Sequence, residues 1–198
     1  HNVGKRKLSE ISLSNYLAKL RRKQGAYDLS FNTICGYKDH GAIIHYSADE
    51  NSNYEIHNDG FLLVDSGGQY LYGTTDITRT IVLANVTDIM KKHFTLVLKS
   101  HIDLAMAIFD KNETDASLDK IARKPLWDEG LDYNHGTGHG VGHILNVHEG
   151  PQSIRHNKLN PIKMKKGMIT SNEPGLYIEG QYGIRHENEL LCVKVDDN

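Results

Sequence analysis

Histidine and glycine alternate along residues 135–151, HGTGHGVGHILNVHEGP, and five of the chain's twelve histidines fall within or just after this segment. His135, His139 and His143 have the spacing of a zinc site on one helical face. The four glycines among them argue against a helix, since each interior glycine costs about 0.5–1 kcal/mol relative to alanine. In an extended chain these three histidines share one face, and His148 joins them only through a bend or bulge. Glycine would then allow other backbone or a substrate to approach closely; the alternative is a set of surface histidines.

Four carboxylates stand in or beside strand-like runs elsewhere in the chain. Asp65 ends the apolar run FLLVD, and Asp76 opens a run rich in β-branched residues. Aspartate is unfavourable inside strands and costly to bury unless it is paired or bound to a metal. A turn residue before SGG is the simpler interpretation of Asp65, and Arg79 is a candidate ion-pair partner for Asp76. Glu173 in SNEPG and Glu187 in IRHENELL complete the set.

Two aspartates, two glutamates and a histidine make a ligand set without thiolates. Such a set suits two hard or borderline divalent ions better than a structural zinc. Bridging carboxylates hold two ions roughly 3.5–4 Å apart, where the ions generate hydroxide and stabilise a tetrahedral intermediate. The residues by themselves therefore predict a dinuclear hydrolase.

The composition excludes several other classes of protein. With 198 residues the chain is long enough for a substantial core, and 38% hydrophobic and 24% charged residues are ordinary for a globular protein. A formal net charge of -2 gives no sign of nucleic acid or an acidic membrane surface as a partner. No apolar run approaches the roughly 20 residues that cross a bilayer. Two widely separated cysteines fit a reducing compartment, so we expect a cytoplasmic location.

The elements that must position these side chains follow from the periodicity of apolar residues, which predicts an α+β chain without repeats or linkers. Amphipathic spacing predicts helices over residues 8–23, 88–109 and 117–127, the last bending near Pro125. Short β-rich runs predict strands at residues 41–46, 61–65, 69–72, 76–83, 168–172 and 189–195. The candidate carboxylates thus lie in or beside strands.

Four segments together resemble the eukaryotic-type aminopeptidase P branch of the pita-bread metallopeptidases, whose relatives include prolidase and methionine aminopeptidase. They are LLVDSGGQYLYGTTDITRT, HGTGHGVGHILNVHEGP, SNEPGLY and GIRHENELL. The resemblance covers about residues 8–195. It implies an α+β pita-bread (creatinase/methionine aminopeptidase-like) fold, with a mostly antiparallel curved sheet covered by helices. It also implies a metal-dependent aminopeptidase that hydrolyses the bond between an N-terminal residue and a following proline, using a hydroxide that bridges two metal ions.

The same resemblance implies five ligands for two divalent ions, most often Mn²⁺. The ligands would be Asp65, Asp76, His139, Glu173 and Glu187. Asp76 and Glu187 would bridge the ions. Asp65 would bind one of them, and His139 with Glu173 the other. Glu173 would also act as the general base towards the bridging water.

Further side chains acquire roles from the resemblance. His45 and His148 match the two catalytic histidines of the family, which contact the substrate, stabilise the developing oxyanion and handle protons. His135 would line the substrate pocket together with Tyr177. Arg185 would orient the first aspartate ligand from behind.

Two histidines depart from the pattern of the family. His186 stands where relatives usually carry an aliphatic residue. We expect a structural role for it, because in a strand its side chain points away from those of its two neighbours. His143 stands where relatives vary and receives no function.

At the level of the whole protein, we expect residues 1–198 to form a single catalytic domain, truncated at both ends, of an enzyme that is a homodimer when complete. Its partners would be peptides with proline in second position, not nucleic acid or a membrane. A prolidase that acts on X-Pro dipeptides and a non-catalytic pita-bread binding module are the alternatives. The complete ligand set argues against the binding module.

Overall fold

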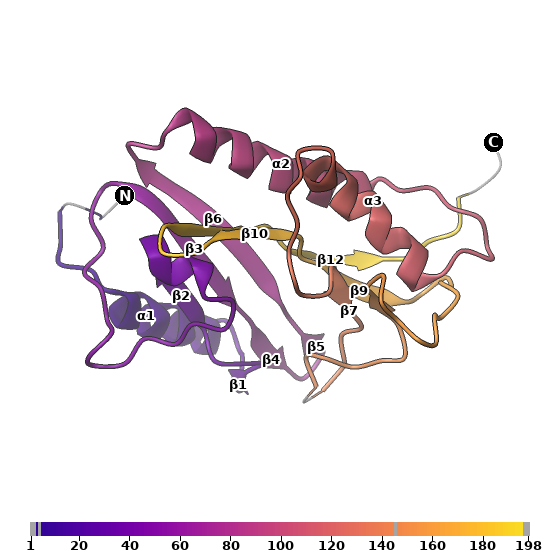
Figure 1. Cartoon of the computed structure of the whole chain (residues 1–198). Coiled ribbons are helices and arrows are strands. Elements are labelled where there is room, and N and C mark those ends of the chain that lie inside the picture. The colour runs from indigo at the N-terminus through magenta and orange to yellow at the C-terminus, as the bar shows by residue number, and fades with distance from the viewer. Residues whose placement is uncertain (1–2, 4, 145, 196–198) are drawn as a thin grey trace.

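Helices cover both faces of an antiparallel sheet in the computed structural model, which describes residues 3, 5–144 and 146–195 (Figure 1). The ends of the expected domain 1–198 and Leu145 of the histidine-rich segment lie outside the described residues. The helices are α1 (Glu10–Lys23), the 3-10 helix η1 (Lys38–Ala42), α2 (Asp88–Ala105) and α3 (Asp115–Trp127). The strands are β1 (Asp28–Leu29), β2 (Ile34–Tyr37), β3 (Gly60–Ser66), β4 (Gly68–Tyr70), β5 (Gly73–Thr74), β6 (Ile77–Ala84), β7 (Gly138–His139), β8 (Ser153–Ile154), β9 (Ile169–Asn172), β10 (Gly175–Ile178), β11 (Tyr182–Arg185) and β12 (Asn188–Leu191).

The three predicted helices are confirmed, and capping side chains account for where each begins. Ser9 accepts a hydrogen bond from the amide of Ser12, and Ser12 returns one to the amide of Ser9, a capping box that starts α1. Thr114 and Ser117 form a capping box at the start of α3, and the hydroxyl of Thr87 accepts a hydrogen bond from the amide of Met90 at the start of α2. The helix predicted for 88–109 ends earlier, at Ala105, and α3 begins two residues before the predicted 117.

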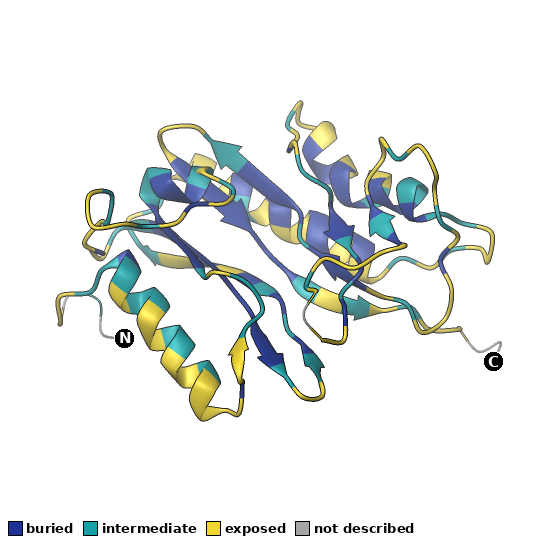
Figure 2. Ribbon diagram, turned by 90° about the horizontal axis from the view of Figure 1, so that it is seen from below, coloured by how far each residue is buried: buried dark blue, intermediate teal, exposed yellow. Residues whose placement is uncertain are grey.

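The strand β3 separates the two halves of the core, because its side chains alternate between the faces of the sheet. Leu62 and Val64 pack in a cluster that α1 covers, whereas Phe61 packs with α2, α3 and β11 on the other side. Buried residues accordingly concentrate in the central strands and the inner helix faces (Figure 2). By this alternation Asp65 faces the same side as Phe61, away from α1.

Hydroxyl groups join the sheet β2-β3-β6 to the hairpin of β10 and β11. Thr80 Oγ1 lies 3.0 Å from the amide nitrogen and 3.1 Å from the carbonyl oxygen of Arg185. In the neighbouring pair of strands, β9 and β12 run antiparallel with Asn188 opposite Asn172. These pairings bring the C-terminal segments of the chain over the end of β3 and the beginning of β6.

The prediction of a strand at residues 41–46 is wrong. Residues 38–42 form η1, residues 43–45 form a turn, and the strand lies upstream at β2. The two isoleucines of this run suggested a ladder, but Ile43 is 54% exposed. The buried side chain is that of Tyr46, and its hydroxyl donates a hydrogen bond to Glu10 of α1. The apolar run therefore packs a turn against the core instead of pairing as a strand.

Candidate metal centre

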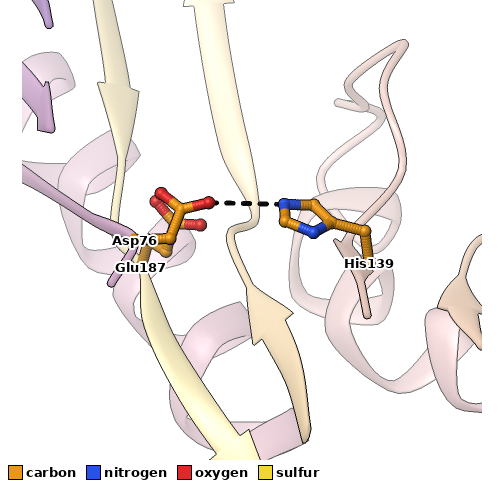
Figure 3. A group of neighbouring side chains, drawn as sticks. All are labelled: Asp76, His139 and Glu187. Carbon is orange, nitrogen blue, oxygen red and sulfur yellow. Dashed lines mark ion pairs between the residues drawn. The ribbon is translucent and has the colours of Figure 1, made fainter. Parts of the chain in front are cut away.

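Asp76, His139 and Glu187 come from three distant parts of the chain, and each offers a ligand atom within 4.8 Å of the others (Figure 3). His139 Nε2 lies 3.4 Å from Asp76 Oδ2, the pair that the dashed line joins in Figure 3. Two carboxylates and an imidazole converging in this way are a donor set for a divalent metal ion.

Backbone pairing places both carboxylates of this group. Asp76 immediately precedes β6, and its amide donates to Glu189 Oε1 at 3.0 Å. Glu187 lies between β11 and β12, where its amide donates to the carbonyl oxygen of Thr78 at 3.1 Å. The hydroxyl of Thr78 then donates to Glu187 Oε2 at 2.7 Å. Arg79, the suspected partner of Asp76, instead donates to the carbonyl oxygens of Thr78 and Glu187.

His139 reaches the site from β7, which lies against β9. Its amide donates to Ser171 Oγ at 3.0 Å, and that hydroxyl donates to Glu173 Oε1, also at 3.0 Å. Glu173 Oε1 lies 3.2 Å from His139 Nε2. A Cβ on Gly138 would overlap the carbonyl oxygen of Ser171, so the alternating glycines allow a close approach of backbone, as predicted from the sequence.

Asp65 lines the same cavity, about 300 Å³ in volume, together with Asp76, His139 and Glu173. The guanidinium of Arg185, which is buried, donates to Asp65 Oδ2 at 2.7 Å. This is the relation that the sequence resemblance implied for these two residues.

Behind the cavity, Arg185 continues a chain of hydrogen bonds to His135. Its Nη1 donates to the hydroxyl of Tyr177 at 2.9 Å, and that hydroxyl lies 2.8 Å from His135 Nε2. Tyr177 therefore contacts the candidate site through His135 and Arg185. His135 itself lines a second, adjoining cavity of about 540 Å³ that it shares with His139 and Glu173.

Two buried carboxylate oxygens test whether this donor set fits a metal. Asp65 Oδ1 and Glu187 Oε1 have no hydrogen-bond partner within the part of the chain that the structure describes. A buried carboxylate oxygen without a donor is strongly unfavourable, and a bound cation removes this penalty. The residues present therefore fit divalent metal ions.

The electrostatics of the site lead to the same conclusion. Burial raises the pKa of Asp65 to about 6, against the opposing effect of Arg185. Burial also raises the pKa of Glu187 well above its usual value, and the neighbouring Glu173 and Asp76 add to the shift. Burial alone would lower the pKa of His139, but hydrogen bonds to Asp76 and Glu173 outweigh it and raise the pKa to about 10. The protein alone provides too little positive charge for these carboxylates.

His45 and His148 line the cavity from opposite segments, and neither belongs to the converging ligand group. The rings of His148 and His139 meet edge to face, with 4.2 Å between centroids. Burial and the adjacent His139 lower the pKa of His148. Both histidines are exposed at the mouth, where a bound substrate can contact them.

A reversal of the chain brings His148 beside His139. The amide of Glu149 donates to the carbonyl oxygen of Gly140 at 2.8 Å, which closes a loop between them. This is the bend that the sequence requires if His148 is to join the other histidines. His143 lies in the loop with its side chain exposed, and its carbonyl oxygen accepts a hydrogen bond from Thr74.

His186 packs edge to face on Phe94 of α2, with ring centroids 4.5 Å apart, while its two neighbours face the site. This agrees with the structural role expected from its position. Sequence reasoning missed the hydroxyl groups that support the ligands, Thr78 and Ser171. A threonine or serine in a strand gives no sign of such a role in the sequence. Thr78 stands two residues after Asp76, however, so in an extended chain their side chains lie on the same face.

The profile of metallopeptidase family M24 matches residues 2–194. The chain belongs to this family. A relative from Laccaria bicolor, described as probable Xaa-Pro aminopeptidase P, is 51% identical over 84% of this chain and 26% of its own length. Aminopeptidase P2 of Arabidopsis thaliana is 47% identical over 92% of this chain and 26% of its own length. The resemblance to aminopeptidase P drawn from the four motifs is therefore confirmed.

Solved structures of M24 members share the architecture. X-prolyl aminopeptidase from Caenorhabditis elegans, described as a cytosolic enzyme with a di-nuclear active site, superposes with a TM-score of 0.89. It is 42% identical, over 93% of this chain and 30% of its own. Prolidase from Pyrococcus furiosus has a TM-score of 0.85 at 27% identity, over 95% of this chain and 54% of its own. The predicted pita-bread fold is confirmed.

The chain spans between 26% and 31% of the length of the curated relatives that it matches. None of the helices in the described part of the chain combines the length and the apolar character that a membrane crossing requires.

Proposed function

We propose that this protein is a metal-dependent Xaa-Pro aminopeptidase, which removes an N-terminal residue that precedes proline. One observation carries the proposal. Asp65 and Glu187 each have a buried carboxylate oxygen without a donor among the described residues, in a cluster that also holds Asp76, His139 and Glu173. A fully structural cluster would have no reason to leave these oxygens unpaired. The names of the relatives at 47% and 51% identity support the substrate class.

Five side chains would hold two divalent ions, for which we propose Mn²⁺. They are Asp65, Asp76, His139, Glu173 and Glu187. Asp76, just before β6, and Glu187, between β11 and β12, are the proposed bridging ligands. When bound, the ions polarise the carbonyl of the scissile bond and provide a strong nucleophile from water near neutral pH.

The chain's own side chains supply the remaining chemistry. Glu173 would accept the proton of the attacking water, because its carboxylate stays ionised beside His139. His148 and His45 would donate hydrogen bonds to the oxygen that becomes negative in the transition state. A histidine with a lowered pKa, as at His148, still carries one ring proton to donate.

Proline specificity has a physical basis in the proposed site. The bond before proline has no N–H group, and the ring fixes the local geometry. Peptidases that bind their substrate as a strand lose a hydrogen bond there, whereas a metal site that recognises the free amino group does not need it. His135, held by Tyr177, would border the pocket for the ring.

Three peptides test this function in the complete enzyme loaded with Mn²⁺. We expect Arg-Pro-Pro to be cleaved with a higher kcat/KM than Arg-Ala-Ala and than the dipeptide Arg-Pro. A preference for Arg-Ala-Ala would refute proline specificity, and activity confined to Arg-Pro would identify a prolidase. Full metal content without hydrolysis of any of the three would indicate a binding module.

The setting of the enzyme is part of the proposal. We propose a cytoplasmic enzyme that acts on peptides as a homodimer, with residues 1–198 as its catalytic domain. The description of the Caenorhabditis elegans relative as cytosolic supports the location. Fractionation of cells and light scattering of the purified complete protein test the location and the oligomeric state.

A further inference from the structure

We propose that a buried cluster of Glu10, His40 and Tyr46 positions His45 for its action on the substrate, an inference that rests on the proposed function. Each of these residues is buried, and none is a proposed metal ligand. Tyr46 also lines the cavity of the metal centre, next to His45. In the sequence, Glu10 is simply an acidic residue in the first turn of a helix. The structure makes it the centre of a network that ends at the turn carrying His45.

The carboxylate of Glu10 joins four segments of the chain. Its Oε1 accepts a hydrogen bond from the amide of Tyr37 at 2.8 Å and lies 3.0 Å from His40 Nδ1. Its Oε2 accepts from the hydroxyl of Tyr46 at 3.0 Å and from the amide of Tyr54 at 2.9 Å. Glu10 has no exposed surface, and both of its oxygens are satisfied. The carboxylate therefore connects α1 to β2, to η1 and to the segments that contain Tyr46 and Tyr54.

Aromatic stacking makes the cluster rigid in a second direction. The ring of His40 stacks on Tyr46 with 4.3 Å between centroids and on Tyr54 with 3.7 Å between centroids. The three rings therefore form one aromatic stack. Burial raises the pKa of Tyr46 to about 12, which keeps on its hydroxyl the proton donated to Glu10. Stacked rings with satisfied polar ends have few alternative arrangements.

The buried Tyr46 directly follows the exposed His45 in the sequence. Tyr46 is 6% exposed, whereas His45 projects at the mouth of the cavity that Asp65, His139 and His148 also line. The amide of Tyr46 donates to the carbonyl oxygen of Ile43 at 3.1 Å, which closes the turn around His45. The backbone of His45 is therefore held in place through its peptide bond to the buried Tyr46, and this sets the direction of the His45 side chain.

The turn is also held against the strand that leads to the metal centre. A Cβ on Gly41 would lie 3.2 Å from the backbone nitrogen of Gly183 in β11, so η1 and β11 touch through backbone alone. Two residues further along that strand is Arg185, which is bonded to Asp65. The same contacts that fix His45 therefore fix its distance from the carboxylates.

Energetic arguments favour the positioning of His45, rather than the stability of the fold, as the role of this cluster. Replacing a buried charged network by well-packed apolar residues is often neutral or stabilising, so a network of this kind adds little net stability. What it supplies is a single arrangement, because every donor and acceptor must meet its partner at once. A misplacement of a reacting group by about 1 Å can reduce the rate a hundredfold.

The test is a double-mutant cycle of Tyr46→Phe and His45→Ala in the complete enzyme loaded with Mn²⁺, with Arg-Pro-Pro as substrate. Tyr46→Phe keeps the ring stack and removes only the hydroxyl. We expect kcat to fall by about tenfold or more, with KM changed less than about twofold and metal content unchanged, since misplacement affects the chemical step. In the His45→Ala background the same substitution should have almost no further effect on kcat, because the group that it positions is gone.

Two variants separate positioning from loss of stability. Glu10→Gln keeps the shape of the cluster, and it should reproduce the kcat defect of Tyr46→Phe. Leu118→Ala, in a separate core cluster under α3, should lower the melting temperature without the kcat defect. If Tyr46→Phe lowers kcat by the same factor with and without His45, the cluster does not act through His45 and the inference is overturned. An unchanged kcat in His45→Ala would overturn it as well.

A measurement without turnover keeps this inference distinct from the proposed function. Hydrogen exchange of the Tyr46 amide, which bonds Ile43, should accelerate at least about tenfold in Tyr46→Phe, because local opening of the turn becomes easier. Equal protection in the two proteins would refute positioning whatever the substrate. A failure of the enzyme to cleave Arg-Pro-Pro, with the exchange difference present, would count against the Xaa-Pro activity alone. The cycle would then be run on the substrate that is cleaved.

Discussion

Two buried charged clusters lie on either side of the histidine-rich segment, and they differ in how their oxygens are satisfied. Behind His135, the fully buried Asp119 accepts from Arg123 Nε at 2.6 Å and lies 2.7 Å from His156 Nδ1. Its other oxygen accepts from the hydroxyl of Thr137. Arg123 is equally well matched, since it also donates to the carbonyl oxygens of Tyr133 and His135.

On the other side of the histidine-rich segment, the carboxylates outnumber the donors that could satisfy them. Four carboxylates, on Asp65, Asp76, Glu173 and Glu187, face one buried guanidinium, that of Arg185, within the described residues. One oxygen of Asp65 and one of Glu187 lack any donor there. Burial therefore does not distinguish a structural carboxylate from a candidate metal ligand. The unsatisfied oxygens of Asp65 and Glu187 distinguish this cluster as a whole, because a buried charge without a partner needs a cation.

Replacing Asp76 by Asn should have the largest effect, since it removes a proposed bridging ligand and not a structural partner. We expect loss of at least one metal ion per chain and a fall in kcat/KM of at least about a thousandfold, because metal assistance is worth several kcal/mol. Metal analysis and peptide assays on the complete enzyme measure both. Asp128→Asn, at an exposed pair with Lys124, is the matched control and should change neither. Full metal content and activity in Asp76→Asn would remove the distinction between the two clusters.

Replacing Asp119 by Asn should do the opposite. Removing one partner of a buried ion pair typically costs 3–5 kcal/mol, so we expect the free energy of unfolding to fall by about 3 kcal/mol. The metal content of the folded protein should not change, because Asp119 has no unsatisfied oxygen. Chemical denaturation and metal analysis of the same samples check the two parts. Loss of metal without loss of stability would show that Asp119 belongs with the metal ligands and not with the structural carboxylates.

Replacing His148 by Ala examines a residue of neither cluster, at the edge of the metal centre. We expect the metal to remain while kcat falls by roughly a hundredfold, since a lost oxyanion donor typically costs about 2.7–4 kcal/mol. His143→Ala is the control from the same loop, because the side chain of His143 is exposed. Metal lost in parallel with activity would move His148 among the ligands.

Replacing Glu187 by Gln should give the smallest effect, and one of unusual sign. In the metal-free protein we expect a gain of about 1 kcal/mol in the free energy of unfolding, because folding no longer has to bury a carboxyl group whose pKa burial raises. Added Mn²⁺ should stabilise the wild type in proportion to its binding and stabilise this variant much less. Thermal unfolding with and without metal compares them. A destabilised metal-free variant would show that Glu187 is paired as well as Asp119 is.

Much of the secondary structure was predictable because it depends on neighbouring residues. Ser9 and Thr114 cap helices whose apolar positions already repeat at helical spacing. The strand ending at Asp65 was readable from its apolar run, and the glycines of the segment at 135–142 correctly excluded a helix. The failure at residues 41–46 has a nonlocal cause. Tyr46 packs with Ile34 and Leu63, and its hydroxyl donates to Glu10, 36 residues away in the sequence.

The sequence by itself determined the kinds of ligand atoms, their order along the chain and, through four motifs, the family. It did not determine which carboxylate oxygens would be left without a donor. That depends on partners brought from far away, since Arg185 reaches Asp65 across 120 residues and Thr78 reaches Glu187 across 109. Each of these donors satisfies one oxygen of its carboxylate, and no donor among the described residues reaches the other. Only the tertiary structure decides which oxygens remain for a metal.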